Sequence, residues 1–432
     1  MAMYKTKIIK EFIEKQKKDT ICFDFPFKVI YKKVNNPISF IAFFTRVGSI
    51  YENEDEKGIA HLIEHCIFRG SSKYPQDISK LINSLGGYTN AYTSYDQTAY
   101  YINLPSENLY KALDILWDMI INPLFRQNDL DSERNIIFHE IEMRDDDPVT
   151  VLFEETLKKM YKNNPMRHPI IGYTHTLKNI TLNHVNCFYS QYKNPKNSFF
   201  VVVTDEDPTK VYNSFEELFK KLPENVYNSE QSVLNYDYKD EEICYDRLNL
   251  KGNVNKTYLM ISFVSPTLEE QYKNIEKAYF ISLASYILGG SSYSILNRVI
   301  KNDLKIVDAV NFDMYSTNKL PGIIYLTAVT ESKNVERVVQ EFCKIVKDLK
   351  SYIELDYFEI CKENFESSAF WNFETSANQG MLIGSNELFK SYLEAYEYIG
   401  KIQKIKLNDM LEVFYSYVDL NRFMVSVYEK DE

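Results

Sequence analysis

The chain has 432 residues, of which 45% are hydrophobic and 26% are charged, and its formal net charge is −11 at pH 7. This length predicts two domains, and the composition is that of a globular protein. The negative charge argues against nucleic acid as a partner and is compatible with basic peptides. No apolar run reaches the ~18–20 residues of a membrane span, so no membrane association is predicted.

The first twenty residues contain lysines interleaved with Glu11 and Glu14 and no arginine. They lack the apolar core of a signal peptide and the arginine-rich composition of a transit peptide, so a cytoplasmic protein is expected. The six cysteines form no C-x-x-C pair. We expect them to be reduced and mostly buried.

The first half of the chain predicts a mixture of strands and helices. In chain order they are strands at 23–31 and 39–47, a helix from residue 59, a helix at 78–85 ended by Gly86-Gly87, one long strand or a hairpin at 88–104, helices at 107–121 and 129–144, and a buried strand at 199–203. The polar segment 222–240 has no helical period and is predicted to be a linker.

The second half repeats this order weakly. It predicts a strand at 258–263, a helix at 279–288, a strand pair at 306–314 and 322–329, and a helix at 335–349. The repeat predicts an α+β fold with two similar domains, each a mainly antiparallel sheet packed with helices. The expected boundaries are 1–221 for the metal-binding domain, 222–240 for the linker and 241–432 for the second domain, which lacks the metal motif.

The segment His61-Leu62-Ile63-Glu64-His65 carries the chemistry. On an α-helix, residues i and i+4 share a face, so His61 and His65 can bind one metal ion. Glu64 projects towards the same side and can reach a metal-activated water. The order H-x-x-E-H is the inverzincin signature. The opposite, apolar face of the helix consists of Ile59, Leu62, Ile63, Cys66 and Ile67.

A catalytic zinc ion usually takes three protein ligands and leaves one position for water. The helix at 129–144 can supply the third ligand, because Glu133 and Glu140 are seven residues apart and share a face. Spacing alone does not choose between them, and an ordinary acidic helix face is the competing interpretation.

The segment from Glu133 to Met143, about 75 residues after His65, resembles the second signature of the pitrilysin-type zinc metallopeptidases. This family includes half-length bacterial homologues similar to the mitochondrial processing peptidase. The resemblance implies zinc as cofactor, with His61, His65 and Glu140 as its ligands. It further implies Glu64 as general base and Glu133 as a carboxylate that orients a ligand, and it leaves His139 as a non-ligand.

Two other segments support this resemblance: Asn90-Ala91-Tyr92-Thr93 with its flanking residues, and Pro169-Ile170-Ile171-Gly172. In the family the first of these is an edge strand that binds the substrate backbone by β-addition over the metal. The resemblance therefore implies peptide substrates bound at residues 90–93. A plain interior strand is the competing interpretation.

The expected reaction is hydrolysis of peptides or unfolded segments. Zinc lowers the pKa of bound water to about 7, and Glu64 takes the proton and returns it to the leaving amine. Two further classes compete with this prediction: a non-catalytic peptide-binding or scaffold subunit that retains a structural metal, and a different metallohydrolase, which no motif in the sequence supports. Structural zinc sites normally have four ligands rich in cysteine, which disfavours the scaffold.

The second domain departs from the family pattern. The family places an arginine and, seven residues later, a tyrosine that hold the substrate, and the corresponding positions here are Ile300 and Val307. Neither side chain donates a hydrogen bond. In half-length relatives, a chain with the zinc motif can pair with a homologue that has lost zinc but kept the arginine and the tyrosine. The resemblance therefore implies a heterodimer with a non-catalytic homologue, with a homodimer as the alternative.

Overall fold

The computed structural model describes residues 2–223, 226, 234, 236, 241–268 and 275–431. Contacts divide the chain into two compact units. The first unit consists of Met1–Ile141, Pro169–Asn235 and Phe370–Tyr398, and the second of Glu142–His168, Tyr236–Ala369 and Ile399–Glu432. Each unit has one β-sheet covered by helices, which confirms the predicted α+β class. The predicted linker, 222–240, lies mostly outside the described residues, and the predicted domain boundaries stay a prediction.

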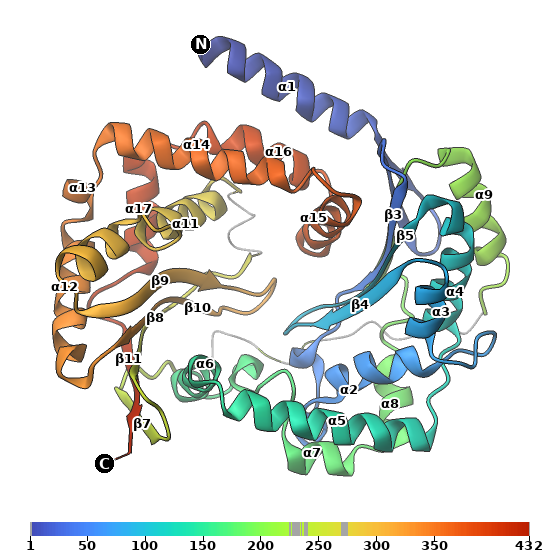
Figure 1. The fold of residues 1–432 in the computed structure, drawn as a ribbon, viewed down its shortest axis with the longest axis horizontal. Helices are drawn as coiled ribbons and strands as arrows, with labels where there is room; N and C mark the ends of the chain where they lie inside the picture. Colours follow the sequence, from blue (N-terminus) through green and yellow to red (C-terminus); the bar gives the residue numbers. More distant parts are fainter. Residues whose placement is uncertain are drawn as a thin grey trace. The chain divides into compact units, whose positions relative to one another are not determined.

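The sheet of the first unit has six strands in the order β1-β2-β6-β3-β5-β4 (Figure 1). They are β1 (Thr20–Phe23), β2 (Lys28–Lys33), β3 (Ile38–Thr45), β4 (Tyr88–Thr93), β5 (Thr98–Pro105) and β6 (Ser198–Thr204). Only β2 and β6 pair in parallel. The single strand predicted at 23–31 is wrong: the chain turns between β1 and β2, where Pro26 has no N–H for a strand ladder. The segment 88–104 is a hairpin.

Side chains alternate between the two faces of this sheet. Ile41 and Phe43 point to one face and join the larger core of the unit. The helices that contribute to this core are α2 (Ile59–Cys66), α3 (Ile78–Ser84), α4 (Leu109–Ile121), α5 (Gln127–Asp145), α7 (Thr174–Asn179), α8 (Leu182–Tyr189) and α9 (Pro208–Phe219). The helix with the histidine motif is therefore held in the main core of the unit.

The opposite face of the first sheet is covered by residues from late in the chain. Phe40 and Phe44 of β3 contact α15 (Ser376–Phe389). Two glycines of α15 allow this approach: a Cβ added at Gly380 would lie 2.1 Å from Cδ1 of Phe40, and one at Gly384 would lie 2.1 Å from Cζ of Phe44. Any larger residue at either position would separate the helix from the sheet.

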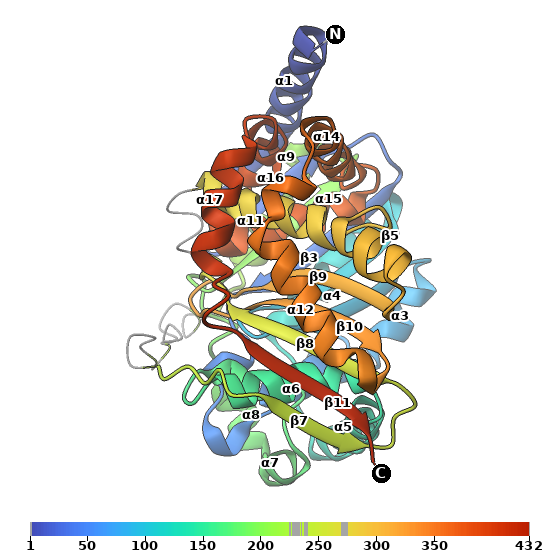
Figure 2. The same ribbon diagram turned by 90° about the vertical axis from the view of Figure 1, so that its left-hand side faces the viewer.

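The sheet of the second unit has the order β7-β11-β8-β10-β9, of which β7, β11 and β8 lie side by side in Figure 2. Its strands are β7 (Leu248–Gly252), β8 (Thr257–Val264), β9 (Val307–Tyr315), β10 (Ile323–Thr330) and β11 (Met424–Lys430). On one face, the ring of Phe312 contacts Phe342 of α12 (Val335–Lys347) and Phe414 of α17 (Leu407–Tyr417).

The other face of the second sheet is covered by α6 (Pro148–Met160), from the first half of the chain. Phe153 of α6 meets Tyr325 edge to face with a centroid separation of 5.6 Å. Thr156 Oγ1 donates to Ser426 Oγ over 2.8 Å in a buried position. Each sheet is thus completed by a helix from the opposite half of the sequence, α15 for the first sheet and α6 for the second.

The other long helices are α1 (Ala2–Lys18), α11 (Ile275–Leu288), α14 (Leu355–Trp371) and α16 (Glu394–Ile402). Among the described residues, none of the helices combines the length and the apolar composition needed to cross a bilayer. All six cysteines are free, as expected. The expectation that most are buried is wrong, because Cys22 and Cys187 are exposed and only Cys66 and Cys361 are buried.

Candidate metal centre

The N-terminus of α2 is fixed by a buried carboxylate. Glu52 accepts hydrogen bonds from the backbone N–H groups of Gly58 and Ala60, each over 2.9 Å. The first N–H groups of a helix have no intrahelical partner, so Glu52 caps α2, and burial raises the pKa of this carboxyl group to about 8. Gly58 has φ of 97° and lies so close to Gly172 that neither position has room for a side chain. The predicted Pro169–Gly172 motif therefore supports the start of the helix.

The apolar stripe of α2 is buried as predicted, with exposed fractions of 0–2% for Ile59, Leu62, Ile63, Cys66 and Ile67. The two imidazoles lie on the other side of the helix, with ring centroids 4.7 Å apart. Glu140 of α5 faces both rings: its Oε2 is 3.9 Å from Nε2 of His61 and 3.6 Å from Nε2 of His65. The described residues contain one group able to hold a metal ion, and it consists of these three side chains.

This geometry fits a zinc ion. Two ligands 2.0–2.1 Å from a tetrahedral zinc are about 3.3 Å apart, close to the distances between Glu140 and the two rings. Two nitrogens and one carboxylate oxygen are a donor set that catalytic zinc accepts. The nitrogen of His61 that faces Glu140 is Nε2, whereas its buried Nδ1 lacks a hydrogen-bond partner among the described residues. The site offers three protein ligands and leaves a position for water.

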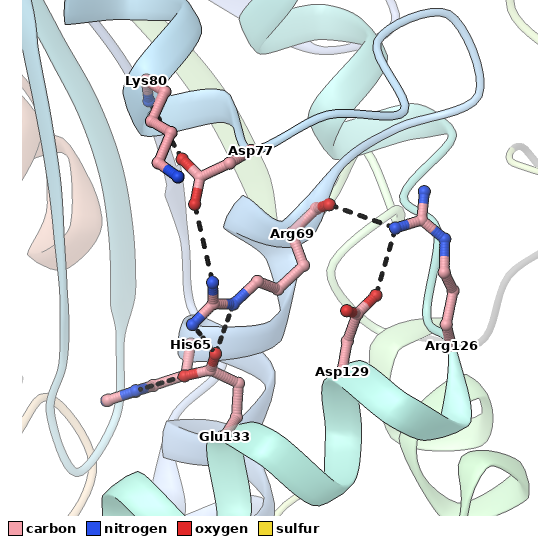
Figure 3. Close-up of polar contacts among 7 residues, drawn as sticks. All are labelled: His65, Arg69, Asp77, Lys80, Arg126, Asp129 and Glu133. Carbon is pink, nitrogen blue, oxygen red and sulfur yellow. Dashed lines mark hydrogen bonds and ion pairs between the residues drawn. The ribbon is translucent and has the colours of Figure 1, made fainter.

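Glu133 of α5 contacts the ring of His65 (Figure 3). Its Oε2 lies 3.1 Å from Nδ1 of His65, and its side chain is only 3% exposed. Burial alone would raise the pKa of Glu133, but hydrogen bonds from His65 and Arg69 outweigh burial and hold its pKa below the usual value. An acceptor at Nδ1 leaves the lone pair of His65 on Nε2, the atom that faces Glu140. The structure thus separates the two glutamates that spacing could not distinguish.

Glu64 lies between the metal group and β4. Thr93 Oγ1 donates to Glu64 Oε2 over 2.6 Å. Burial raises the pKa of Glu64 and the charge of Glu140 raises it further, whereas the bonds from Thr93 and the charge of His65 oppose the rise. A carboxylate held in this way has the raised basicity that a general base requires.

The two histidines have opposite protonation tendencies. Burial, with a contribution from the charge of His65, lowers the pKa of His61 to about 3. Burial also disfavours the charged form of His65, but the hydrogen bond to Glu133 and the nearby carboxylates outweigh it and raise the pKa of His65. His61 is therefore neutral at neutral pH, whereas a metal ion at this site would have to compete with a proton at His65.

The predicted substrate-binding residues lie on β4, the last strand of the first sheet. Asn90 is exposed, and Ala91, Tyr92 and Thr93 are half-buried. Strand β4 pairs with β5 on one side only, which leaves its other edge without a strand partner in the described sheet. The hydroxyl of Thr93 donates its hydrogen bond to Glu64, so it has no second proton to donate to another group.

The remaining predicted positions lie in the second unit. Ile300 is 0% exposed and Val307 is 7% exposed, so both positions belong to the apolar core. His139 lies on α5 next to Glu140 but is not part of the metal group. Glu52 and Arg69 were not predicted from the sequence; only their closeness to the histidine motif, within nine residues on either side, could have indicated them.

Comparisons with known proteins agree with this geometry. The family model "Insulinase (Peptidase family M16)" matches residues 28–174, and "Peptidase M16 inactive domain" matches residues 179–365. An uncharacterized zinc protease of Rickettsia felis is 28% identical over 373 residues, 86% of this chain and 87% of that protein. The beta subunit of the human mitochondrial-processing peptidase is 34% identical over 151 residues, 34% of this chain and 31% of that protein.

A solved structure of a protease from Helicobacter pylori has the same fold, with a TM-score of 0.84 at 19% identity. The match covers 95% of this chain and 98% of that chain. The two family models lie next to each other and together account for most of the sequence, and the residues of the metal group fall within the first. The chain therefore belongs to the insulinase family of peptidases, family M16.

Proposed function

We propose that this chain is a zinc-dependent endopeptidase that cleaves peptides or unfolded segments. The observation that carries the proposal is the convergence of His61, His65 and Glu140 beside Glu64 at the edge of a sheet. His61, His65 and Glu140 would hold the ion. A bound zinc ion supplies a Lewis acid that activates water and stabilises the charge that develops on the substrate oxygen.

The protein groups perform the remaining steps. The edge of β4 that pairs with no strand of the described sheet, at residues 90–93, binds the backbone of an extended substrate and sets the scissile carbonyl near Glu64. Thr93 holds Oε2 of Glu64, which leaves Oε1 to take a proton from the attacking water. The same oxygen returns the proton to the leaving amine. Glu133 keeps His65 in the tautomer that presents Nε2.

Two measurements test this function on a quenched fluorescent peptide. Zinc chelation should abolish cleavage, and added zinc should restore it. Glu64→Gln should keep one zinc per chain but lower the cleavage rate by about 10²–10⁴-fold. Full activity of Glu64→Gln would refute the role of Glu64, and chelation that unfolds the protein would favour the alternative, a peptide-binding or scaffold subunit with a structural metal.

The proposal includes a partner. Ile300 and Val307 are buried, apolar residues at positions where the family resemblance places a substrate-binding arginine and tyrosine. The human relative is named as one subunit of a peptidase, which supports a two-subunit arrangement here. We propose a heterodimer with a non-catalytic homologue: the purified chain should cleave poorly and be activated by that partner. A fully active homodimer, identified by its mass in solution, would contradict this.

The domain division belongs to the same proposal. Residues 1–221 would form the metal-binding domain, 222–240 the linker and 241–432 the second domain. The shared strand order of the two sheets supports this duplication.

A further inference from the structure

Glu133 carries a charge in a place that water hardly reaches. Its side chain is 3% exposed, and a buried carboxylate is stable only when its oxygens have donors. Its Oε2 forms a hydrogen bond with Nδ1 of His65, and its Oε1 accepts hydrogen bonds from both Nε and Nη2 of Arg69. The position of the carboxylate that faces His65 therefore depends on Arg69.

Arg69 is itself held on its far side (Figure 3). It ends the short 3-10 turn Ile67–Arg69 that follows α2, four residues after His65. Its Nη1 lies 3.5 Å from Oδ2 of Asp77, and Oδ1 of Asp77 accepts the N–H of Lys80 to cap α3. Arg69 thus connects three helices. The residue itself follows α2, and its guanidinium group pairs with Glu133 of α5 and with Asp77, the N-cap of α3.

We infer that Arg69 is a positioning residue for the metal centre, which acts through Glu133 to fix the ring of His65. The inference rests on the proposed function. Without the guanidinium, Glu133 would keep a single donor and would turn towards solvent or the loop before α3. His65 would lose the acceptor that fixes its tautomer and ring angle, and Nε2 would no longer be directed at the ion.

The competing explanation is that Arg69 only joins the helices. A matched control is available in the same network (Figure 3). Arg126 donates to the backbone oxygens of Arg69 and Pro75 and pairs with Asp129 at 3.2 Å, so it also connects α5 to the α2–α3 segment. Within the described part of the chain, no hydrogen bond or ion pair joins Arg126 to Glu133 or His65. A purely structural role would make the two arginines equivalent.

The test uses the full chain and measures zinc affinity by competition with a chromophoric chelator, together with the absorption spectrum of the cobalt(II)-substituted protein. Arg69→Met should weaken zinc binding about 10–100-fold and change the cobalt spectrum. Arg126→Met should leave the zinc affinity within about twofold of the wild type and the cobalt spectrum unchanged. Arg69→Lys keeps the charge but not the planar pair of donors, and should weaken binding by several-fold.

A double-mutant cycle with Glu133→Gln shows whether Arg69 acts through Glu133. The double variant should bind zinc no more weakly than Glu133→Gln alone. Wild-type affinity in Arg69→Met, or an equal loss in Arg126→Met, would overturn the inference while leaving the proposed function intact. If Arg69→Met does not fold, Arg69→Lys decides by the same criterion. A wild-type chain without zinc affinity would overturn both.

Discussion

The sheets of the two units are built from strands in the same topological order. Without β1, the first sheet has the order β2-β6-β3-β5-β4, and the second has β7-β11-β8-β10-β9. The parallel pair occurs at the same place in each, between the first and the last strand of each set in sequence. A helix follows the second strand of each set, α2 in the first unit and α11 in the second.

The two helices differ in the side chains that they carry. Helix α2 has two histidines and a glutamate on one side, whereas residues 275–288 contain no histidine. All six histidines of the chain lie between His61 and His184. The comparison shows that the shared strand order does not by itself provide a metal-binding group: within the residues that the structure describes, the group able to hold an ion lies in the first unit.

Removing one donor should make the first framework resemble the second. We expect His65→Ala to lose zinc by more than the roughly 10–100-fold that loss of an orienting partner costs, because a ligand itself is removed. Peptide cleavage should fall with it. The measurements are zinc per chain and cleavage rate, with His139→Ala as the control on α5. Equal zinc content in His65→Ala and the wild type would exclude His65 as a ligand.

The helices that cover the two sheets from the opposite half of the chain allow a second test. Gly384→Val should push α15 away from Phe44 and lower the free energy of unfolding by about 3 kcal/mol, because the packed ring cannot yield. Ser385→Ala, the adjacent control, should cost less than about 1 kcal/mol. Denaturant unfolding measures both. An unchanged midpoint for Gly384→Val would mean that α15 does not lie on this sheet.

The strands β2 and β7 occupy the same place in the two sheets but carry lysines of different character. Lys32 of β2 is 1% exposed, and burial lowers its pKa to about 8. Between about pH 8 and the usual 10.4, the unfolded chain binds a proton here that the folded chain does not, so stability rises with pH in this window. Lys251 of β7 is exposed and pairs with Glu429 at 2.9 Å.

Lys32→Met removes this titration. The stability of the wild type relative to Lys32→Met should therefore increase by about 2–3 kcal/mol between pH 7 and pH 10.5, as measured by urea unfolding at each pH. Lys251→Met is the control for the loss of an exposed lysine at the equivalent strand. A constant difference between wild type and Lys32→Met across this range would contradict the buried, low-pKa state of Lys32.

The edge strand β4 gives the finest test, because two of its threonines point their hydroxyls at different partners. Thr93 Oγ1 donates to Glu64, whereas Thr89 Oγ1 donates to the backbone oxygen of Tyr101 over 2.9 Å. We expect Thr93→Val to reduce kcat about tenfold with zinc content unchanged, and Thr93→Ser to restore it. Thr89→Val is the isosteric control. A change confined to KM would assign Thr93 to substrate binding only.

Helix α2 and its buried face were predictable from the sequence, because the apolar period and the spacing of the two histidines both indicate a helix over the same eight residues. The choice between Glu133 and Glu140 depended on family resemblance, since both lie on one helical face. Their difference is tertiary: Glu133 meets Nδ1 of His65, and Glu140 faces Nε2 of both histidines. Local spacing does not record which side of a distant ring a carboxylate approaches.

The fold was predicted at the level of strands and helices but not in how the halves exchange segments. The buried side of α15 mixes small and polar residues with only two large apolar ones, Ile383 and Leu388, so its sequence shows no continuous apolar stripe of the kind that predicts a buried helix. The rings of Phe40 and Phe44 occupy the space that the glycines leave open. The sequence of α15 alone therefore does not show which surface the helix covers, because its glycines are explained only by the sheet that they contact.

The placement of α15 also has a consequence for synthesis of the protein. Ser376 Oγ donates to the carbonyl oxygen of Ile38, a contact between residues 338 positions apart. A ribosome that has just released β3 must add more than three hundred residues before the covering helix emerges. During translation the nascent chain therefore leaves Phe40 and Phe44 without α15. This exposed apolar face of β3 is where a chaperone would bind or where aggregation would begin.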